Sequence, residues 1–271
     1  MLILYKSNGG FSNRLFAMTW AEAYAIDNNE CFIDISNDDL CFYYNIKKNK
    51  KISCITKKLE KHKYNMPLLL QRIFKIGVCN YDSEQDFEEN SNKISNFRIK
   101  FISGWYFRHN LKKHREYFKN KYSLRKEYIE YNETFLKLLK YKRSKITLIG
   151  VHIRRGDYKI WENGAYYFDW SVYLSKILEL RTLLSHSGHQ NTQIIVFSNE
   201  EVGEYNFDEN ITISREPWFV DHCLMGMCDY LIGPPSTFSM WASFIGGAKL
   251  CFLTSAEQQL KLSDFKEYYG N

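Results

Sequence analysis

Hydrophobic and polar residues follow two different periods near the start of the chain. Apolar residues run through Leu2 to Tyr5, and a Ser-Asn-Gly-Gly turn follows them. From Asn13 to Ile26 the apolar residues recur at helical spacing, and Cys31 to Ile35 is a second short apolar run. A strand, a glycine turn, a helix and a strand in this order predict a βαβ unit of a parallel sheet.

The pattern weakens in the next part of the chain and then becomes helical. Residues 37 to 103 are mixed and polar, with one apolar island at 66 to 76, and they predict no definite elements. Residues 111 to 143 are rich in Lys, Glu, Leu and Tyr and contain neither Pro nor Gly. This composition favours helices. We expect these helices to run up to a domain junction near residues 142 to 145.

The second half of the chain alternates strand-like and helical segments. The expected strands are 146–153, 193–197, 211–213, 230–232 and 249–253. The expected helices are 169–184, which starts with an acidic cap at Asp169, 221–228 and 236–245. Such alternation predicts an α/β fold with a doubly wound sheet. For 271 residues we expect two domains with a cleft between them, residues 1–144 and 145–271.

Composition and charge narrow the class of protein. The chain is 45% hydrophobic and 25% charged, which excludes a disordered or fibrous protein. The net charge is +6, and lysines gather in residues 47–51 and 57–63. These lysines either form solvated helix faces or attract an anionic partner, such as a nucleotide-sugar, a membrane surface or a nucleic acid. No nucleic-acid-binding motif accompanies them, so we expect no nucleic-acid partner.

The cysteines and histidines predict neither disulfides nor a metal site. The seven cysteines are odd in number and scattered, and the segments around three of them are apolar, so we expect buried, reduced thiols in a reducing compartment. These three are Cys31, Cys79 and Cys251. The spacing of His222, Cys223 and Cys228 suits a packed helix better than a zinc site.

No apolar stretch approaches the length needed to span a membrane, and the apolar N-terminal run is too short for a signal peptide. We therefore expect a cytoplasmic protein that is at most peripheral at the inner membrane face.

The strongest local feature is the end of the apolar strand at His152-Ile-Arg-Arg-Gly-Asp-Tyr158. Ligands of open α/β sheets bind at such strand ends. Because side chains alternate along a strand, we expect His152 and Arg154 to share a face, with Arg155 on the other. A guanidinium binds phosphate oxygens in pairs and suits a diphosphate. The alternative is a structural ion pair between an arginine and Asp157 that closes a loop.

Two glycine-containing turns precede helices and are further candidates. After Gly-Pro-Pro, a helix starts with Ser236 as its cap, followed by Thr237 and Phe238, and Gly246 and Gly247 end it. The N-terminus of a helix attracts anions, although ordinary capping explains the same residues.

The other turn lies at the start of the chain. There, Gly10 would let the backbone approach a ligand closely, with Asn13 and Arg14 facing a cleft.

Several segments together resemble the bacterial α-1,2-fucosyltransferases, glycosyltransferase family 11, and their α-1,6- and protein O-fucosyltransferase relatives. The similar segments are 9–16 (G-G-x-G-N-Q-L-F in the family), 103–107 (an aromatic segment), 152–158 (H-x-R-R-x-D-Y), 196–199 (a strand end with S-D/N) and 236–241 (S-T-F-S-W-W). Ser12, Arg14 and Met240 depart from the family pattern. Arg14 is closer to the α-1,6 relatives, which leaves the linkage open.

The resemblance implies a GT-B fold, in which two Rossmann-like domains face each other across a cleft. It also implies GDP-β-L-fucose as the donor bound by the C-terminal domain, no metal, and inverting transfer of fucose to a glycan. From the residues we expect catalytic roles for Arg154, Asp157 and Glu162, with Asp169 as another candidate base. The expected donor-binding residues are His152, Arg154, Arg155, Asp157, Ser198, Ser236, Thr237, Phe238, Asn13 and Gly10.

Two other functions remain open from the sequence. One is a glycosyltransferase with a different nucleotide-sugar donor, and the other is a non-catalytic glycan-binding protein on the same fold. The acceptor is expected to be a lipid-linked or soluble glycan in surface polysaccharide or glycan biosynthesis. Residues 37–103 would shape its site, and the lysine-rich stretches would contact an anionic membrane surface.

Overall fold

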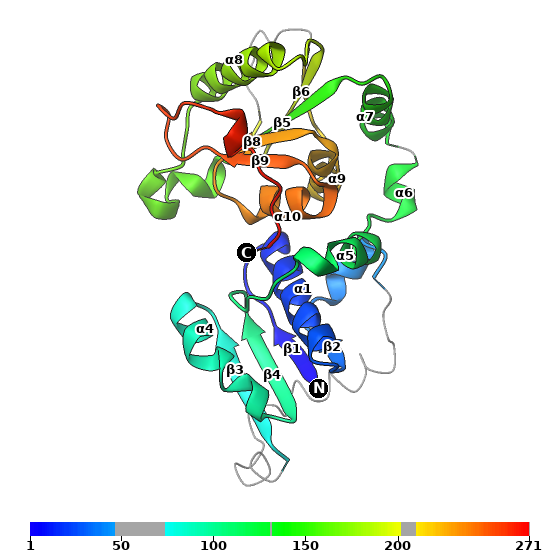
Figure 1. Cartoon of the computed structure of the whole chain (residues 1–271), viewed down its shortest axis with the longest axis vertical. Coiled ribbons are helices and arrows are strands. Elements are labelled where there is room, and N and C mark those ends of the chain that lie inside the picture. Colours follow the sequence, from blue (N-terminus) through cyan, green and yellow to red (C-terminus); the bar gives the residue numbers. More distant parts are fainter. Residues whose placement is uncertain (47–73, 131, 202–209, 271) are drawn as a thin grey trace. The chain divides into compact units, whose positions relative to one another are not determined.

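The computed structural model describes residues 1–46, 74–130, 132–201 and 210–270, and these form two compact units (Figure 1). Unit 1 contains residues 1–123 with Tyr269 and Gly270, and unit 2 contains residues 124–268. Unit 2 begins at residue 124, whereas the boundary expected from the sequence lies between residues 144 and 145. The reason is that Phe135 and Leu138, from the helical stretch before residue 144, are buried in a core of unit 2. Both lysine-rich stretches, 47–51 and 57–63, fall outside the described residues.

Unit 1 is built on a parallel sheet in the order β2-β1-β4-β3. Its strands are β1 (Leu2–Lys6), β2 (Phe32–Asp34), β3 (Ile76–Tyr81) and β4 (Ile99–Gly104). The predicted βαβ start is confirmed, since α1 (Phe11–Asp27) connects the parallel strands β1 and β2. The shorter helices are η1 (Asp38–Phe42), α4 (Glu84–Ser91), η2 (Ile94–Asn96), η3 (Lys112–His114) and α5 (Arg115–Lys121).

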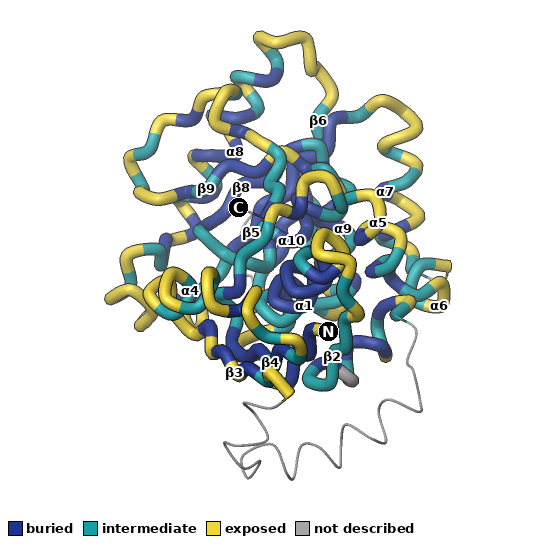
Figure 2. Tube along the Cα trace, turned by 60° about the horizontal axis from the view of Figure 1, so that its bottom comes forward, coloured by how far each residue is buried: buried dark blue, intermediate teal, exposed yellow. Residues whose placement is uncertain are grey.

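Helix α1 is the core helix of unit 1 and is buried along most of its length (Figure 2). Leu15 and Phe16 are at most 1% exposed, and each such burial contributes about 1.5–3 kcal/mol. The Trp20 indole donates a hydrogen bond of 2.8 Å to the carbonyl of Gly270, which fastens the end of the chain to unit 1. The buried carboxylate of Glu22 accepts a hydrogen bond of 2.9 Å from the hydroxyl of Tyr122.

Unit 2 is built on a second parallel sheet in the order β7-β6-β5-β8-β9. Its strands are β5 (Thr147–Ile153), β6 (Thr192–Ser198), β7 (Ile211–Ile213), β8 (Tyr230–Gly233) and β9 (Lys249–Phe252), so all five predicted strands are confirmed. Every residue of the central strand β5 is buried, as expected for a parallel strand covered on both faces.

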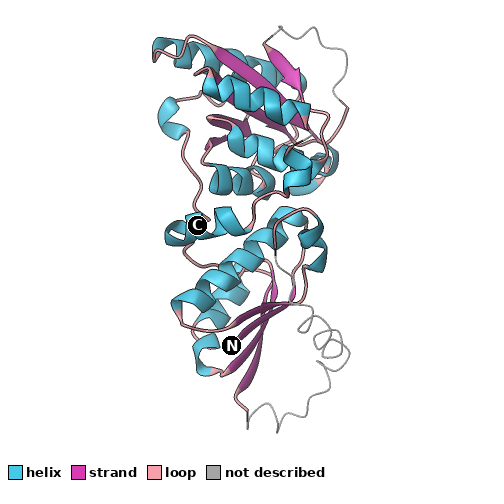
Figure 3. Cartoon of the chain, turned by 90° about the vertical axis from the view of Figure 1, so that its right-hand side faces the viewer, coloured by secondary structure: helices cyan, strands magenta, loops and turns pink. Residues whose placement is uncertain are grey.

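Helices cover both faces of the unit 2 sheet (Figure 3). They are α6 (Lys126–Ile129), α7 (Glu133–Arg143), α8 (Trp170–His186), α9 (Trp218–Met227) and α10 (Thr237–Gly246), with the short η4 (Gly156–Lys159), η5 (Trp161–Gly164) and η6 (Leu262–Asp264). One core joins α8 to one face of β5, and a second core joins α7, α9 and α10 to the other face. The doubly wound sheet predicted from the sequence is therefore confirmed.

Helices α9 and α10 touch through their backbones. A Cβ atom on Gly246 would lie 2.0 Å from the carbonyl oxygen of Gly226, so only glycine fits at this crossing. Gly247 then ends α10 with a φ of 90°, the left-handed conformation that glycine adopts readily.

Some local predictions need correction. Cys31 is exposed rather than buried, because it precedes the first residue of β2, whereas Cys79 and Cys251 are buried as predicted. Asp169 occupies the N-cap position of α8, but its side chain makes no capping hydrogen bond. Among the described helices, none is long and apolar enough to cross a membrane.

Candidate donor site

The candidate residues of unit 2 gather at one edge of its sheet. Because all five strands are parallel, their carboxyl ends meet at this edge, where open α/β sheets bind ligands. Strand β5 leads into Arg154, β6 ends at Ser198, and β8 ends at Gly233, just before Ser236. A Cβ atom at Gly233 would lie 2.5 Å from the carbonyl oxygen of His152, so glycine is needed where β8 approaches β5.

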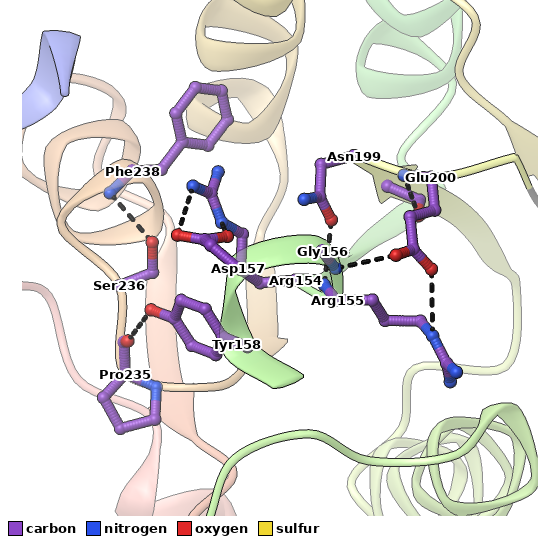
Figure 4. A network of polar contacts seen from close by, with 11 residues as sticks. Arg154, Arg155, Gly156, Asp157, Tyr158, Asn199, Glu200, Pro235, Ser236 and Phe238 are labelled. Carbon is purple, nitrogen blue, oxygen red and sulfur yellow. Dashed lines mark hydrogen bonds and ion pairs between the residues drawn. The ribbon is translucent and has the colours of Figure 1, made fainter. Parts of the chain in front are cut away.

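The alternation of β5 separates the two arginines. Ile149, Val151 and Ile153 pack with α8, whereas Leu148 packs in the core of α9 and α10. Continuing this alternation puts Arg154 on the α10 side and Arg155 on the α8 side. Figure 4 shows Arg154 beside Ser236 and Phe238, and Arg155 pointing away from them toward Glu200.

Arg154 has one hydrogen-bonding partner among the described residues. Its Nε and Nη2 atoms donate to the two carboxylate oxygens of Asp157, at 2.8 and 3.0 Å. The ion pair that the sequence offered as an alternative is therefore present. It uses two of the five guanidinium N–H groups, and the other three have no partner in the described part of the chain. With 33% of its side chain exposed, Arg154 can also bind an anion.

Arg155 is more buried and has several partners. Only 15% of its side chain is exposed. Nε donates to Glu200 at 3.2 Å, Nη1 donates to the carbonyl of Phe168 at 3.0 Å, and Nη2 donates to the hydroxyl of Tyr167. The backbone N–H of Arg155 donates to Asn199 at 2.8 Å. These contacts tie the turn after β5 to the end of β6 and to the segment before α8.

His152 lies near the end of β5, two residues before Arg154, and is 4% exposed. Its ring centroid lies 5.4 Å from that of Phe238, which also stacks on His222 at 4.3 Å. Burial, and secondly the charge of Arg154, lower the pKa of His152 to about 3, so its imidazole is neutral at physiological pH. Its buried Nδ1 atom has no hydrogen-bond partner among the described groups. His152 thus adds no positive charge to the site.

The start of α10 lies next to the Arg154 turn. Ser236 caps the helix, with its Oγ atom accepting from the backbone N–H of Phe238 at 3.2 Å. Thr237 is the first helical residue, and the first turn of a helix carries N–H groups without intrahelical acceptors. Tyr158 connects the two segments, because its hydroxyl donates to the carbonyl of Pro235.

The two candidate bases are both exposed carboxylates. Glu162 has φ 47° and ψ 40°, and the following Asn163 has φ 55° and ψ 29°. This left-handed backbone costs non-glycine residues about 1–3 kcal/mol each and is common at functional sites. Asp169 is 83% exposed and lies 3.7 Å from Nη1 of Arg155, on the opposite side of β5 from Arg154.

The candidates of unit 1 form their own turn after β1. Gly10 is the N-cap of α1 and provides no side-chain cap. Gly9 has φ 86°, and a Cβ there would lie 2.4 Å from Nδ2 of Asn13. The buried Oδ1 of Asn13 has no partner among the described groups. Arg14 does not project freely, because Asp39 binds it in a bidentate pair at 2.9 and 2.7 Å.

Three residues at the unit 2 edge were not singled out from the sequence. Tyr158 and Glu200 are the anchors already described, and Asp221 is a buried carboxyl on α9 that accepts a hydrogen bond from Ser214. Burial raises the pKa of Asp221 to about 7. The sequence could have indicated that Asp221 is buried, because it lies three residues before the apolar Leu224 and so on the same face of the helix. Among the described residues, no cluster of His, Cys, Asp and Glu could hold a metal ion.

Sequence comparisons find distant relatives. No family model matches the chain. Galactoside alpha-(1,2)-fucosyltransferase 1 of Saimiri sciureus is 27% identical over 173 residues, covering 57% of this chain and 44% of the relative. Its counterpart in Aotus azarae is 28% identical over 182 residues, with the same coverage. The match thus spans less than half the length of these relatives.

Structural comparisons identify the fold. A mutant of Arabidopsis thaliana FUT1 in complex with GDP has a TM-score of 0.56 at 10% identity, covering 97% of this chain and 72% of the other. The α-1,6-fucosyltransferase NodZ, known from Bradyrhizobium, has a TM-score of 0.56 at 13% identity, covering 97% of this chain and 96% of the other. The chain is therefore distantly similar to the galactoside α-(1,2)-fucosyltransferases, and its α/β fold with two parallel sheets matches GT-B glycosyltransferase structures.

Proposed function

We propose that this protein transfers L-fucose from GDP-β-L-fucose to a hydroxyl group of a glycan, with inversion at the anomeric carbon and without a metal ion. The observation that carries the proposal is the pairing of Arg154 with the start of α10. Arg154 keeps three N–H groups without hydrogen-bond partners among the described residues, beside a helix N-terminus. The distant homology to galactoside α-(1,2)-fucosyltransferases supports fucose as the transferred sugar.

The donor diphosphate would lie between Arg154 and the first turn of α10. As the bond between C1 of fucose and the phosphate oxygen breaks, its electron pair leaves with GDP. Arg154 and the positive end of α10, including the backbone N–H group of Thr237, then stabilise the growing negative charge. Asp157 holds Arg154 in position by its bidentate contact. Tyr158 keeps the start of α10 beside this pair.

The acceptor hydroxyl would attack from the opposite side of C1. A bond forms between its oxygen and C1, and its proton passes to a carboxylate, for which we propose Glu162. Attack on the face opposite the leaving phosphate converts the β-linked donor into an α-linked product. Glu162 fits this role because it is exposed and lies on the loop that follows Arg154 and Asp157.

The other predicted donor contacts are proposals of the same kind. Ser198 ends β6 at the same sheet edge, and His152 supports the ring of Phe238 under the start of α10. In unit 1, Gly10 and Asn13 are proposed as further donor-binding residues. The acceptor would be a lipid-linked or soluble glycan of surface-polysaccharide or glycan biosynthesis, at the cytoplasmic side of a membrane.

The direct test is a transfer assay with GDP-fucose and a panel of β-galactosides, N-acetylglucosaminides and lipid-linked glycans, followed by linkage analysis of the product. We expect an α-fucosylated product and GDP in equal amounts, and activity that persists in EDTA. Calorimetry should show tighter binding of GDP than of UDP. Tighter binding of UDP would instead favour another sugar donor, and glycan binding without release of GDP would favour a non-catalytic protein.

A further inference from the structure

An exposed tryptophan lies on the loop that follows the Arg154 segment. Trp161 is 41% exposed, and the preceding Ile160 is 82% exposed. Large apolar side chains are mostly buried in folded proteins. Two neighbouring exposed apolar side chains beside a charged site therefore indicate a surface that can contact a ligand. Neither has a part in the phosphate contacts proposed above.

The indole of Trp161 is supported from within unit 2. Its ring centroid lies 4.7 Å from Tyr158 and 5.3 Å from Tyr166, at interplanar angles of 40° and 31°. Tyr158 is itself 7% exposed and anchored through its hydroxyl to Pro235. The Arg154 guanidinium lies 5.8 Å from the centre of the Tyr158 ring. The indole is therefore held at a defined place relative to Arg154, through one intervening ring.

The backbone beyond Trp161 keeps this arrangement compact. Glu162, Asn163 and Gly164 have φ values of 47°, 55° and 78°, a left-handed run that turns the chain back on itself. In this run, the backbone N–H of Ala165 donates to the carbonyl of Glu162 at 3.1 Å. The turn presents the indole and the proposed base Glu162 as consecutive residues.

We infer that Trp161 is a stacking platform for a pyranose ring of the acceptor glycan. The face of an aromatic ring carries partial negative charge and attracts the C–H groups on the apolar face of a sugar. A sugar stacked on Trp161 would present its hydroxyl groups near Glu162, the group proposed to take the proton. This inference rests on the proposed fucosyl transfer and makes Trp161 a residue that positions the acceptor.

The test compares Trp161→Ala, Trp161→Phe and the control Leu178→Ala in the full chain. Leu178 is 62% exposed on α8 and belongs to none of the site contacts, so it controls for loss of an exposed apolar side chain. Trp161→Ala should raise the KM for the acceptor about tenfold, as expected for losing one stacking contact of about 1.4 kcal/mol. The KM for GDP-fucose and the Kd for GDP should not change. Trp161→Phe should keep most of the acceptor affinity, and Leu178→Ala should match the parent protein.

Two kinetic results would overturn the inference. One is an acceptor KM of Trp161→Ala equal to that of the parent, and the other is a loss confined to GDP-fucose, which would place the donor's sugar on the indole. Saturation-transfer NMR with methyl β-galactoside and methyl β-N-acetylglucosaminide provides a readout without turnover. Loss of sugar signal in Trp161→Ala supports the platform even if the parent transfers no fucose, a result that would refute only the proposed function. Unchanged sugar signal refutes the platform.

Discussion

Two adjacent arginines at the end of β5 lie in opposite environments. Arg154 is 33% exposed, donates hydrogen bonds to Asp157 alone among the described residues, and keeps donors available on the α10 side. Arg155 is 15% exposed and is fixed on the α8 side by Glu200, Phe168 and Tyr167. The same residue type thus keeps donors available on one face of the strand and holds loops together on the other. If this division is correct, substitutions on the Arg154 side change rates, and substitutions on the Arg155 side change stability.

The largest expected effect is that of Arg154→Ala on catalysis. Removing a group that stabilises transition-state charge lowers kcat by about 10²–10³-fold. The free energy of unfolding should fall by at most about 1 kcal/mol, because exposed ion pairs contribute little. Transfer assays and urea unfolding measure the two quantities. Arg143→Ala, at the exposed end of α7, is the matched control and should leave both unchanged. A fully active Arg154→Ala protein would refute the assignment.

The next effect separates the two candidate bases. Glu162→Gln removes the proposed proton acceptor on the exposed loop and should lower kcat about 10²-fold. Asp169→Asn, on the Arg155 side, should keep nearly full activity, since its carboxylate contributes only a 3.7 Å contact to Arg155. Steady-state kinetics of the two variants decide between them. The reverse outcome would transfer the role to Asp169 and break the proposed division between the two sides.

Arg155→Met tests the architectural side. The substitution removes the hydrogen bonds from Arg155 to the Glu200 carboxylate and to the Phe168 carbonyl. Glu200 keeps the hydrogen bond from the backbone N–H of Gly156 at 2.8 Å. We expect the free energy of unfolding to fall by about 2–3 kcal/mol. Urea denaturation measures this loss. GDP affinity should fall less than in Arg154→Ala. A Met variant as stable as the parent, but unable to bind GDP, would show that Arg155 holds the donor directly.

The last prediction concerns the pH dependence of stability and rests on Asp221, another buried group at this edge. Burial raises its pKa from an ordinary value near 4 to about 7 in the folded protein. The folded state therefore holds a proton that the unfolded state has lost between these pH values. The stability contributed by this raised pKa of Asp221 is complete below pH 4 and is lost as the pH rises to about 7. Thermal melts of Asp221→Asn should show a weaker fall in Tm across this range than those of the parent. Identical slopes would contradict the shifted pKa.

The sequence predicted the fold of unit 2 well because its strands are short apolar runs separated by recognisable helix signals. It also predicted the opposite sides of Arg154 and Arg155, since alternation along a strand is a local property. The partners of these arginines were harder to predict. Glu200 lies 45 residues from Arg155, and Pro235 lies 77 residues from Tyr158, and only the folded chain brings them together.

Unit 1 was predicted less completely, because β3, α4 and β4 lie in a polar stretch with weak periodicity. Strand β3 alternates buried and exposed residues at Gly77 to Tyr81 instead of forming a continuous apolar run. The wrong prediction for Cys31 has a similar origin. Apolar neighbours predicted burial, but burial depends on which other elements cover the residue.

The glycine contact between α9 and α10 determines where this site can be redesigned. A Cβ on Gly246 would lie 2.0 Å from the carbonyl oxygen of Gly226, so Gly246 cannot be enlarged without separating the two helices. A Cβ on Gly226 would lie 3.1 Å from the carbonyl oxygen of Ala242, which leaves little room there as well. A library that aims at new donors would lose folded members if it varied these positions. Ile160 is exposed and has no assigned part in catalysis, so it is the better place for sequence diversity. Changes of acceptor preference should therefore evolve more readily than changes in phosphate binding.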